Sequence, residues 1–532
     1  MSFKVLLLDN VDPLCANVFK KRDVQADQPG KLTEEELYSK IGEYDGLVVR
    51  SGTTVTAELL EKATNLKVVG RAGVGVDNID IQAATAKGVL VMNTPDGNTI
   101  STAEHTCGMI LSLARNIPNA VAKVKSGGWD RKSYMGTEVH GKKLGIIGLG
   151  KIGSEVAKRM SAFGMEIIAY DPFSTHEHAQ EVGAKLVEMD EVLAEADFLT
   201  VHTPLTEKTK GMVSKANAGK LKKGIKLVNC ARGGIFTEMD IVKLLDDGIV
   251  GAVALDVYSQ EPPSEEVYEM LKHDHVICTP HLGASTEEAQ EKVAEQIAEQ
   301  MADALENKNY KGSLNGKSIA LLTNKEVQPY LELAQKLGKM TVQISPEHAN
   351  NFEFEYAGDS AKYSSVLTDG ILKGMLSEYV DETINLINAR VYADERGFEI
   401  REVSASKSKT YSDLITIRLS EGSEYRSISA AVFGDGDYRI VEIDNYGIEL
   451  RMEGDILLYQ NEDKPGMLAS VSGALAKQGI NIAALSLGRS QKGSNAITAV
   501  SVDKKMDENE IDIIRSLDGI QHIRYISLTE KD

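Results

Sequence analysis

Short apolar runs alternate with longer amphipathic stretches along the first 315 residues. Stretches in which apolar residues recur every three or four positions, such as 102–114, 152–163 and 287–305, predict helices. The short runs predict buried strands, and strands that alternate with helices are typical of parallel sheets covered on both faces. Because the strands are too many for one open sheet, we expect two α/β domains. The strands are predicted at 4–8, 46–49, 67–69, 89–92, 143–147, 166–170, 198–202, 226–229, 251–255 and 276–278.

The pattern changes after residue 315. Polar and apolar residues alternate within 316–452, and two such runs flank a short Gly/Asp loop at 434–437, which predicts a hairpin. We expect an α+β domain there. The last segment, 453–532, follows the order strand, helix, strand, strand, helix, strand. This βαββαβ order is that of ferredoxin-like folds.

Composition narrows the possible functions. A length of 532 residues predicts about three to four domains, and 42% hydrophobic with 26% charged residues is ordinary for a globular protein. The net charge of −20 repels nucleic acid and anionic lipid, so we expect neither partner. The four cysteines lie far apart with no zinc-like spacing, so we expect no metal site. Sparse cysteines, together with the lack of a recognisable signal peptide or of an apolar run long enough to span a membrane, predict a cytoplasmic protein.

A glycine-rich turn follows the predicted strand 143–147. Gly148, Gly150 and Gly153 form a GxGxxG pattern, a helix follows, and Asp171 ends the next strand. The glycines let a pyrophosphate approach the helix N-terminus, and Asp171 can accept hydrogen bonds from a ribose. The carboxylate of Asp171 would repel a 2′-phosphate, and 172–178 offers no Arg or Lys to neutralise one. We therefore expect a Rossmann-like domain that binds NAD rather than NADP.

Charged and titratable residues follow several strands on the cofactor side of the expected sheet. Arg232 follows strand 226–229, Glu261 lies in a loop after strand 251–255, and His281 follows strand 276–278. Such positions suit a proton-transfer group and a group that holds a substrate carboxylate. By spacing alone three other histidines compete with His281, namely His105, His140 and His202.

Several motifs together resemble one enzyme family. Residues 148–153 (GLGKIG), 229–234 (NCARGG), 254–262 (ALDVYSQEP) and 279–286 (TPHLGAST) are similar to those of the D-isomer-specific 2-hydroxyacid dehydrogenases. Residues 71–77 (RAGVGVD), 93–99 (NTPDGNT) and 128–136 (GWDRKSYMG) resemble in particular the members that act on 3-phospho-D-glycerate. The resemblance covers the whole chain and matches the long form of those members.

The resemblance implies a role for each site residue. His281 would be the general acid/base, Glu261 would orient it and favour its protonated form, and Arg232 would bind the substrate carboxylate. Arg131 and Lys132 would add charge from a neighbouring subunit. The substrate would contact Arg50, Ser51, Arg71, Gly73, Val74, Asn98 and Arg131. The NAD cofactor would contact Val74, Gly148, Gly150, Lys151, Ile152, Gly153, Asp171, Thr203, Cys230, Ala231, Arg232, Asp256, His281 and Gly283.

The resemblance also implies the division of the chain into domains. A split substrate-binding domain would take 1–96 and 282–315, and the NAD-binding Rossmann domain would take 97–281. The α+β domain at 316–452 would be the intervening domain of the long form. The ferredoxin-like domain at 453–532 would be an ACT domain, an amino-acid-sensing module. Closure of the first two domains would exclude water from the cleft between them.

The ACT resemblance implies an effector. In the family that effector is L-serine, bound between paired ACT domains, and here Asn461, Asp463 and Asn481 would contact it. An ACT domain that serves only assembly is the alternative. The resemblance further implies a homotetramer or another homo-oligomer.

The sequence is compatible with three functions. The first is NAD-dependent oxidation of 3-phospho-D-glycerate to 3-phosphohydroxypyruvate, the first step of L-serine biosynthesis. The second is a related dehydrogenase for an unphosphorylated 2-hydroxy acid, which Arg50 together with Arg71 disfavours. The third is a non-catalytic amino-acid sensor, which the set of Arg232, Glu261 and His281 disfavours.

Overall fold

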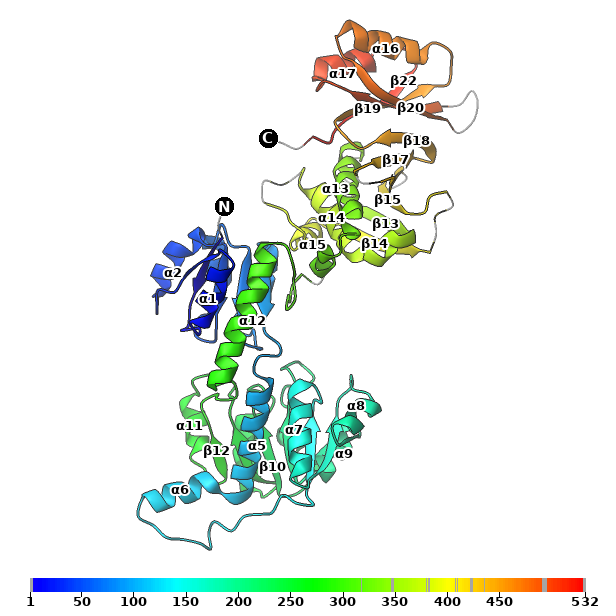
Figure 1. Cartoon of the computed structure of the whole chain (residues 1–532). Helices are drawn as coiled ribbons and strands as arrows, with labels where there is room; N and C mark the ends of the chain where they lie inside the picture. Colours follow the sequence, from blue (N-terminus) through cyan, green and yellow to red (C-terminus); the bar gives the residue numbers. More distant parts are fainter. Residues whose placement is uncertain are drawn as a thin grey trace.

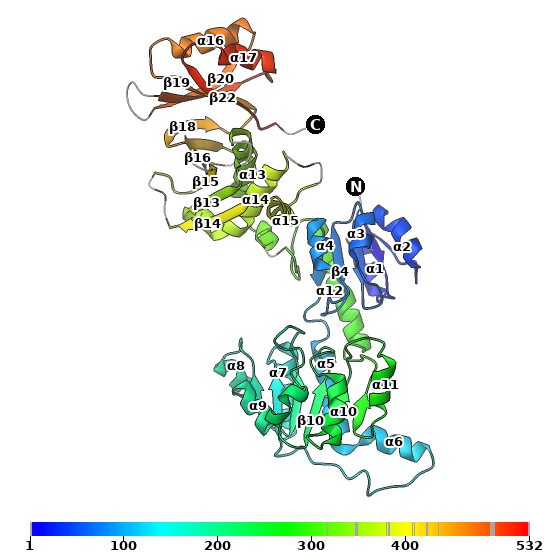
Figure 2. The same cartoon turned by 180° about the vertical axis from the view of Figure 1, so that it is seen from behind.

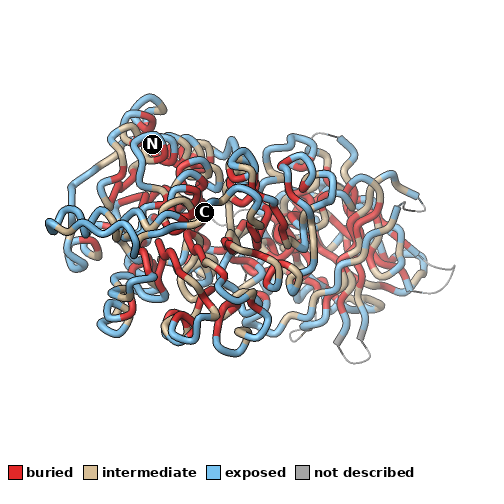
Figure 3. The backbone as a smooth tube through the Cα atoms, turned by 90° about the horizontal axis from the view of Figure 1, so that it is seen from below, coloured by how far each residue is buried: buried red, intermediate tan, exposed pale blue. Residues whose placement is uncertain are grey.

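Four β-sheets follow one another along the chain in the computed structural model (Figure 1). It describes residues 3–529 except 317, 346–348, 379, 381–382, 407, 409, 422–423, 435 and 490–494. Residue 435, in the predicted hairpin loop, lies outside the described residues. The third sheet lies between the first and the fourth, and the second lies on the other side of the first (Figures 1 and 2). Buried residues gather in the interior of the molecule, and exposed residues lie along its outside (Figure 3).

The first sheet is parallel and has the order β2-β1-β3-β4-β5. Its strands other than the short edge strand β2 are largely apolar segments, as expected for strands that helices cover on both faces. They are β1 (Lys4–Leu7), β2 (Gln25–Asp27), β3 (Gly46–Val49), β4 (Val68–Arg71) and β5 (Leu90–Asn93). The helices are α1 (Leu14–Lys21), α2 (Glu34–Lys40), α3 (Ala57–Lys62), α4 (Ile81–Ala86) and the later α12 (Glu287–Leu305).

The second sheet is also parallel and has the order β12-β11-β10-β9-β6-β7-β8. The strand order reverses between β6 and β9, and ligands of open α/β sheets bind at such a switch point. The strands are β6 (Lys143–Ile147), β7 (Glu166–Tyr170), β8 (Ala184–Leu186), β9 (Phe198–Val201), β10 (Ile225–Asn229), β11 (Val250–Leu255) and β12 (Val276–Cys278). The helices are α5 (Thr99–Arg115), α6 (Ile117–Lys125), α7 (Lys151–Ala162), α8 (His176–Glu181), α9 (Met189–Glu195), α10 (Glu238–Asp246) and α11 (Glu265–Leu271).

Helix α12 returns the chain from the second sheet to the first (Figures 1 and 2). It begins after Thr286, whose side chain accepts a hydrogen bond from the N–H of Ala289 and so caps the helix. Ile297 and Met301 of α12 are fully buried in the core of the first sheet. A Cβ atom on Gly70 of β4 would lie 2.1 Å from the sulfur of Met301, so glycine permits this close packing. The first domain therefore combines the N-terminal strands β1 to β5 with the much later helix α12.

The third sheet is mixed and has the order β14-β13-β15-β16-β17-β18, in which only β13 and β14 pair in parallel. Its strands are β13 (Asn351–Ala357), β14 (Glu399–Ala405), β15 (Leu414–Glu421), β16 (Glu424–Val432), β17 (Tyr438–Ile443) and β18 (Tyr446–Arg451). Its helices are α13 (Val327–Ile344), α14 (Ser364–Leu376) and α15 (Ala389–Glu395). The predicted hairpin is confirmed by the antiparallel pairing of β16 with β17.

The fourth sheet is antiparallel and has the order β20-β21-β19-β22. The chain order is β19 (Asp455–Glu462), α16 (Met467–Lys477), β20 (Ile482–Arg489), β21 (Asn495–Val502), α17 (Glu508–Arg515) and β22 (Ile520–Ser527). One face of this sheet joins the core of the third domain through residues such as Ile456 and Ile526. Gln343 of α13 also exchanges two hydrogen bonds with the backbone of Ser527, at 2.8 and 3.1 Å.

The fold class expected from the sequence is confirmed: two parallel-sheet α/β domains, an α+β domain and a ferredoxin-like βαββαβ domain. The domain boundaries at 96, 281, 315 and 452 stay predictions. The sequence pattern missed the edge strands β2 and β8, because three residues are too short to form a recognisable apolar run. No helix among the described residues has the length and apolar character needed to cross a membrane.

Candidate active site

The glycine-rich turn joins β6 to α7. Gly148 has a φ of +95°, and a Cβ atom there would lie 2.5 Å from the carbonyl oxygen of His202. A Cβ atom on Gly153 would lie 2.1 Å from the carbonyl oxygen of Gly148, so both positions require glycine. A Cβ atom on Gly150 would meet nothing within 4 Å, so the N-terminus of α7 is open. An open helix N-terminus at a switch point suits a pyrophosphate group.

The surrounding polar groups also fit a dinucleotide. Asp171, after β7, accepts hydrogen bonds from the N–H groups of Leu149 and Phe173, both at 2.8 Å, and is thereby fixed beside the glycine turn. Thr203, after β9, has a buried hydroxyl with no hydrogen-bond partner among the described residues. Lys151 forms an ion pair with Asp96, which lies between β5 and α5. The donors and acceptors at this edge of the second sheet therefore match the needs of NAD.

His281 and Glu261 form a hydrogen-bonded pair. Nδ1 of His281 lies 2.7 Å from Oε2 of Glu261. The bond to Glu261 raises the pKa of His281 above its ordinary value, although burial and the charge of Arg232 lower it. Burial raises the pKa of Glu261, but the bond and the charge of His281 outweigh burial and hold that pKa below its ordinary value. The two side chains remain 48% and 38% exposed, so Nε2 of His281 is accessible to a substrate.

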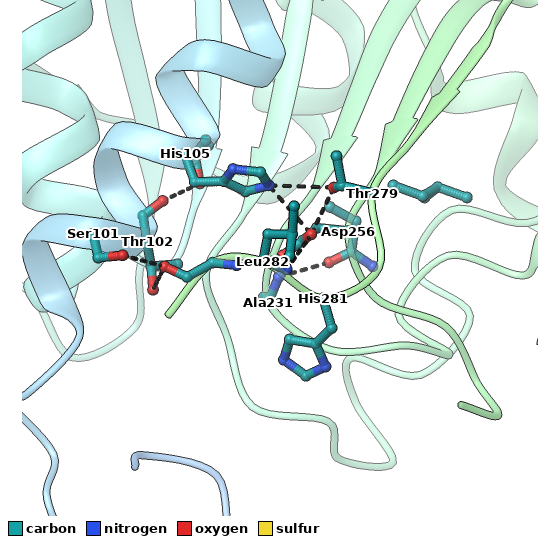
Figure 4. Close-up of polar contacts among 12 residues, drawn as sticks. Ser101, Thr102, His105, Ala231, Asp256, Thr279, His281 and Leu282 are labelled. Atoms are coloured by element: carbon teal, nitrogen blue, oxygen red, sulfur yellow. Dashed lines mark hydrogen bonds and ion pairs between the residues drawn. The ribbon is translucent and has the colours of Figure 1, made fainter. Parts of the chain in front are cut away.

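A buried carboxylate, Asp256, holds the loop that carries His281. Its Oδ1 accepts hydrogen bonds from the N–H of Leu282 (2.7 Å) and the hydroxyl of Thr279 (2.6 Å), and Oδ2 accepts from the N–H of Gly283 (2.9 Å). His105 of α5 lies 3.2 Å from the same Oδ1. Burial raises the pKa of Asp256, but these partners hold it below the ordinary value. Figure 4 shows the imidazole of His281 pointing away from this network.

The same network accounts for a cluster that has the geometry of a metal site. The ligand atoms of His105, Cys230 and Asp256 lie within 4.8 Å of one another. Burial raises the pKa of the Cys230 thiol, and both oxygens of Asp256 already accept hydrogen bonds. We therefore assign Asp256 and His105 to the support of the His281 loop.

The loop that carries Glu261 has its own supporting contacts, which no sequence motif indicates. Glu238, the buried first residue of α10, accepts hydrogen bonds from the N–H (2.7 Å) and Oγ (2.6 Å) of Ser259. The N–H of Tyr258 donates to Oε1 of Glu261 at 3.1 Å, and the Tyr258 hydroxyl donates to the carbonyl of Thr279 at 2.9 Å. These contacts link the two loops of the His281–Glu261 pair.

Three arginines lie near one another: Arg71 at the end of β4, Arg50 after β3 and Arg232 after β10, and the charge of Arg232 also acts on His281. Burial, and then the positive charges of Arg50 and Arg232, lower the pKa of Arg71 to about 10. Arg232 donates to the carbonyl of Ala231 at 2.7 Å and approaches the exposed Asp77 at 3.2 Å. Among the described residues Arg50 has no ion-pair partner. The cluster thus carries positive charge that an anionic ligand would neutralise.

The remaining substrate candidates lie in different surroundings. Gly73 has a φ of +152° and its carbonyl accepts from the N–H of Thr94, while the carbonyl of Val74 accepts from Asn93. Asn98, the residue before α5, has a buried Oδ1 without a partner among the described residues. Ser51 is exposed beside Arg50. Arg131 is exposed in the loop after α6, which lies at the end of the second domain far from the first (Figures 1 and 2).

The three effector candidates do not meet within one chain. Asn461 is buried and pairs with Ala496 near the end of β19, shortly before Asp463. Asn481 precedes Ile482, which pairs with Val502 opposite the first residue of β19. Asn481 therefore lies about 20 Å along the sheet from Asn461, six residues at roughly 3.3 Å each. Asn481 donates to Asp503 at 2.6 Å, and Arg489 lies 3.4 Å from Asp463.

Three parts of the chain match models of known protein families. Residues 107–283 match the family model of the D-isomer specific 2-hydroxyacid dehydrogenase NAD binding domain. Residues 326–444 match the D-3-phosphoglycerate dehydrogenase intervening domain, and residues 456–519 match the ACT domain. The expected NAD cofactor, the α/β fold and the two C-terminal modules are thereby confirmed.

Relatives of the whole chain agree with these matches. A D-3-phosphoglycerate dehydrogenase of Bacillus subtilis is 41% identical over 93% of this chain and 93% of its own length. That of Archaeoglobus fulgidus is 38% identical over 99% of this chain and all of its own length. A D-lactate dehydrogenase from Aquifex aeolicus, solved with NAD and lactic acid, is 26% identical with a TM-score of 0.51, over 57% of this chain and 95% of its own. The chain belongs to the D-3-phosphoglycerate dehydrogenase family.

Proposed function

We propose that the chain oxidises 3-phospho-D-glycerate to 3-phosphohydroxypyruvate with NAD, the first step of L-serine biosynthesis. The observation that carries this proposal is the grouping of Arg50, Arg71 and Arg232, of which Arg232 also acts on His281 of the His281–Glu261 pair. A phosphorylated 2-hydroxy acid carries a phosphate at one end and a carboxylate at the other. An array of guanidinium groups next to an acid/base side chain matches such a molecule.

In this proposal the side chains divide the chemistry between them. Glu261 occupies Nδ1 of His281, so Nε2 is the nitrogen that takes the proton of the C2 hydroxyl. Arg232 binds the carboxylate and polarises the C2 oxygen, while Arg50 and Arg71 bind the phosphate. Bound NAD supplies the acceptor for the hydride from C2. Asp256, Glu238 and Tyr258 keep the two loops in place, so that His281 and Glu261 stay aligned while the proton moves.

The proposed assembly involves a second copy of the chain. Ile117, Val121 and Val124 of α6 are each about half exposed, and Trp129 and Met135 of the next loop are each 81% exposed. This apolar face suits a subunit contact that carries Arg131 toward the cleft of a partner. The separation of Asn481 from Asn461 likewise favours an L-serine site formed between two ACT domains, one contributing each end. A cytoplasmic location stays a prediction; all four cysteines are free.

Replacing His281 tests the function directly. We expect NADH formation from 3-phospho-D-glycerate by the wild-type chain, and a fall in kcat of roughly 10²- to 10⁴-fold for His281→Ala, because the general base is lost. The exposed His140 serves as the control, and His140→Ala is expected to keep wild-type turnover. Near-full turnover by His281→Ala would remove His281 from the mechanism, and absence of NADH formation by the wild type would contradict the function.

The pH dependence tests the His281–Glu261 pair. Oxidation needs the neutral imidazole, so kcat/KM rises as the pH rises through the pKa of His281, which Glu261 holds above its ordinary value. Glu261→Gln removes the negative charge and lowers that pKa. We therefore expect the acid limb of the profile to move to lower pH. Glu265→Gln, a nearby exposed position, is the control, and an unmoved limb in Glu261→Gln would contradict the pairing.

The subunit contact can be tested by charging the face of α6. Val121→Asp places a carboxylate on an apolar surface, and its burial in a contact would be costly. Sedimentation velocity is expected to show an oligomer for the wild type and a smaller species for the variant. A monomeric wild type, or a variant that keeps the full assembly, would contradict the proposed contact.

Feedback by L-serine can be tested on the same assay. We expect millimolar L-serine to lower the activity of the wild type, and Asn481→Ala to lose this response, because a hydrogen-bonding group of the effector site is removed. Ser472→Ala on α16 is the control and should keep it. If L-serine does not change the activity of the wild type, feedback is contradicted and the alternative holds, in which the ACT domain serves only assembly.

A further inference from the structure

Asn78 is the next residue after the 71–77 motif and lies between β4 and α4. Its side chain makes three hydrogen bonds. Nδ2 donates to the carbonyl oxygens of Arg50 (2.7 Å) and Thr53 (2.6 Å), and Oδ1 accepts from Nε of Arg71 (3.3 Å). The bonding groups of this amide are thus shared between the two segments that supply the proposed phosphate-binding arginines.

These bonds determine how Arg71 is presented. Its Nε–H is taken by Asn78, and one N–H of Nη1 is taken by the carbonyl of Ala72 at 2.8 Å. A guanidinium has five N–H donors, so three remain without an acceptor among the described residues. A Cβ atom on Gly73 would lie 2.4 Å from Nη1 of Arg71, so the guanidinium lies directly against that glycine. Asn78 therefore fixes the plane of Arg71 and leaves its outer donors for an anion.

The segment of Arg50 is held from two sides. Asp9 accepts hydrogen bonds from the N–H groups of Arg50 (2.8 Å) and Thr53 (3.0 Å), while Asn78 binds the carbonyl oxygens of the same two residues. The carboxylate of Asp9 thus binds backbone N–H groups, and the guanidinium of Arg50 has no ion-pair partner among the described residues. The turn that presents Arg50 is rigid, and its charge is left for a ligand.

We infer that Asn78 is a positioning residue that gives the site its preference for a phosphorylated substrate. It fixes Arg50 and Arg71 relative to each other through a neutral group. A carboxylate at this place would neutralise Arg71 and face two carbonyl oxygens, whereas the amide supplies two donors and one acceptor without any charge. This inference rests on the proposed function, because it concerns the phosphate end of the same substrate.

Steady-state kinetics of Asn78→Ala separate this role from a general structural one. We expect KM for 3-phospho-D-glycerate to rise about 10- to 100-fold, since charge-assisted hydrogen bonds to the phosphate become misaligned. KM for NAD and kcat at saturation are expected to stay close to those of the wild type. The kcat/KM for unphosphorylated D-glycerate should change little, so the preference for the phosphorylated substrate falls. Asn78→Asp should lose more of that preference than Asn78→Ala.

Asn65→Ala is the matched control, because Asn65 also donates its side-chain amide to a backbone carbonyl, that of Gly42, on the exposed surface of the same domain. Parallel losses with both substrates in Asn78→Ala, or unchanged kinetics, would overturn the inference.

Inorganic phosphate gives a readout that does not depend on turnover. We expect phosphate to raise the Tm of the wild type and of Asn65→Ala but not that of Asn78→Ala, because only a site with fixed arginines binds the ion well. An equal shift in all three proteins would overturn the inference even if the kinetics changed. A wild type that binds phosphate but does not oxidise 3-phospho-D-glycerate would contradict the proposed function alone and leave the role of Asn78 supported.

Discussion

The positive charge of three neighbouring arginines, which have one ion pair between them among the described residues, is the constraint on which the site depends. Arg50 and Arg232 lie in loops and Arg71 ends β4, and burial together with the positive charges of the other two arginines lowers the pKa of Arg71 to about 10. The exposed Asp77 is the acidic group that reaches Arg232. The chain as a whole has a net charge of −20, so this arginine cluster is a local exception. Such an arrangement stores repulsion that a dianionic ligand relieves.

The residues around the arginines and His281 hold the loops of the site through backbone groups rather than through the charges of the arginines. Asp9, Asp256 and Glu238 direct their carboxylates at N–H groups of the loops that carry Arg50, His281 and Glu261, respectively. Asn78 and Asn229 use neutral amides to hold the loops of Arg50 and Arg232. The loops are thereby rigid while the arginines keep their charge. Preorganised donors of this kind are available to a ligand without further ordering.

The sequence predicted the parts of the fold and site that depend on local pattern. The bounds of α12 agree with the expected 287–305, and the GxGxxG turn lies where a strand, a glycine turn and a helix were expected. The close pairing of His281 with Glu261 followed from family motifs, whereas spacing alone left other histidines open. The short edge strands β2 and β8 gave no periodic signal.

The contacts that support these loops could not be predicted from the sequence, because they join residues that are far apart along the chain. Glu238 binds Ser259, and Asp9 binds Arg50 and Thr53, with no motif that pairs them. Asn78 directly follows a recognised motif, but its hydrogen bonds to the segment after β3 form only because β3 and β4 are neighbours in the sheet. The separation of Asn461 from Asn481 likewise follows from strand register in the fourth sheet.

The proposed substrate site can be tested by a structure of the chain with NADH and 3-phosphohydroxypyruvate. We expect the phosphate between Arg50 and Arg71, the carboxylate on Arg232, and the C2 oxygen within hydrogen-bond distance of Nε2 of His281. A phosphate bound away from Arg50 and Arg71, or a C2 oxygen out of reach of His281, would contradict it.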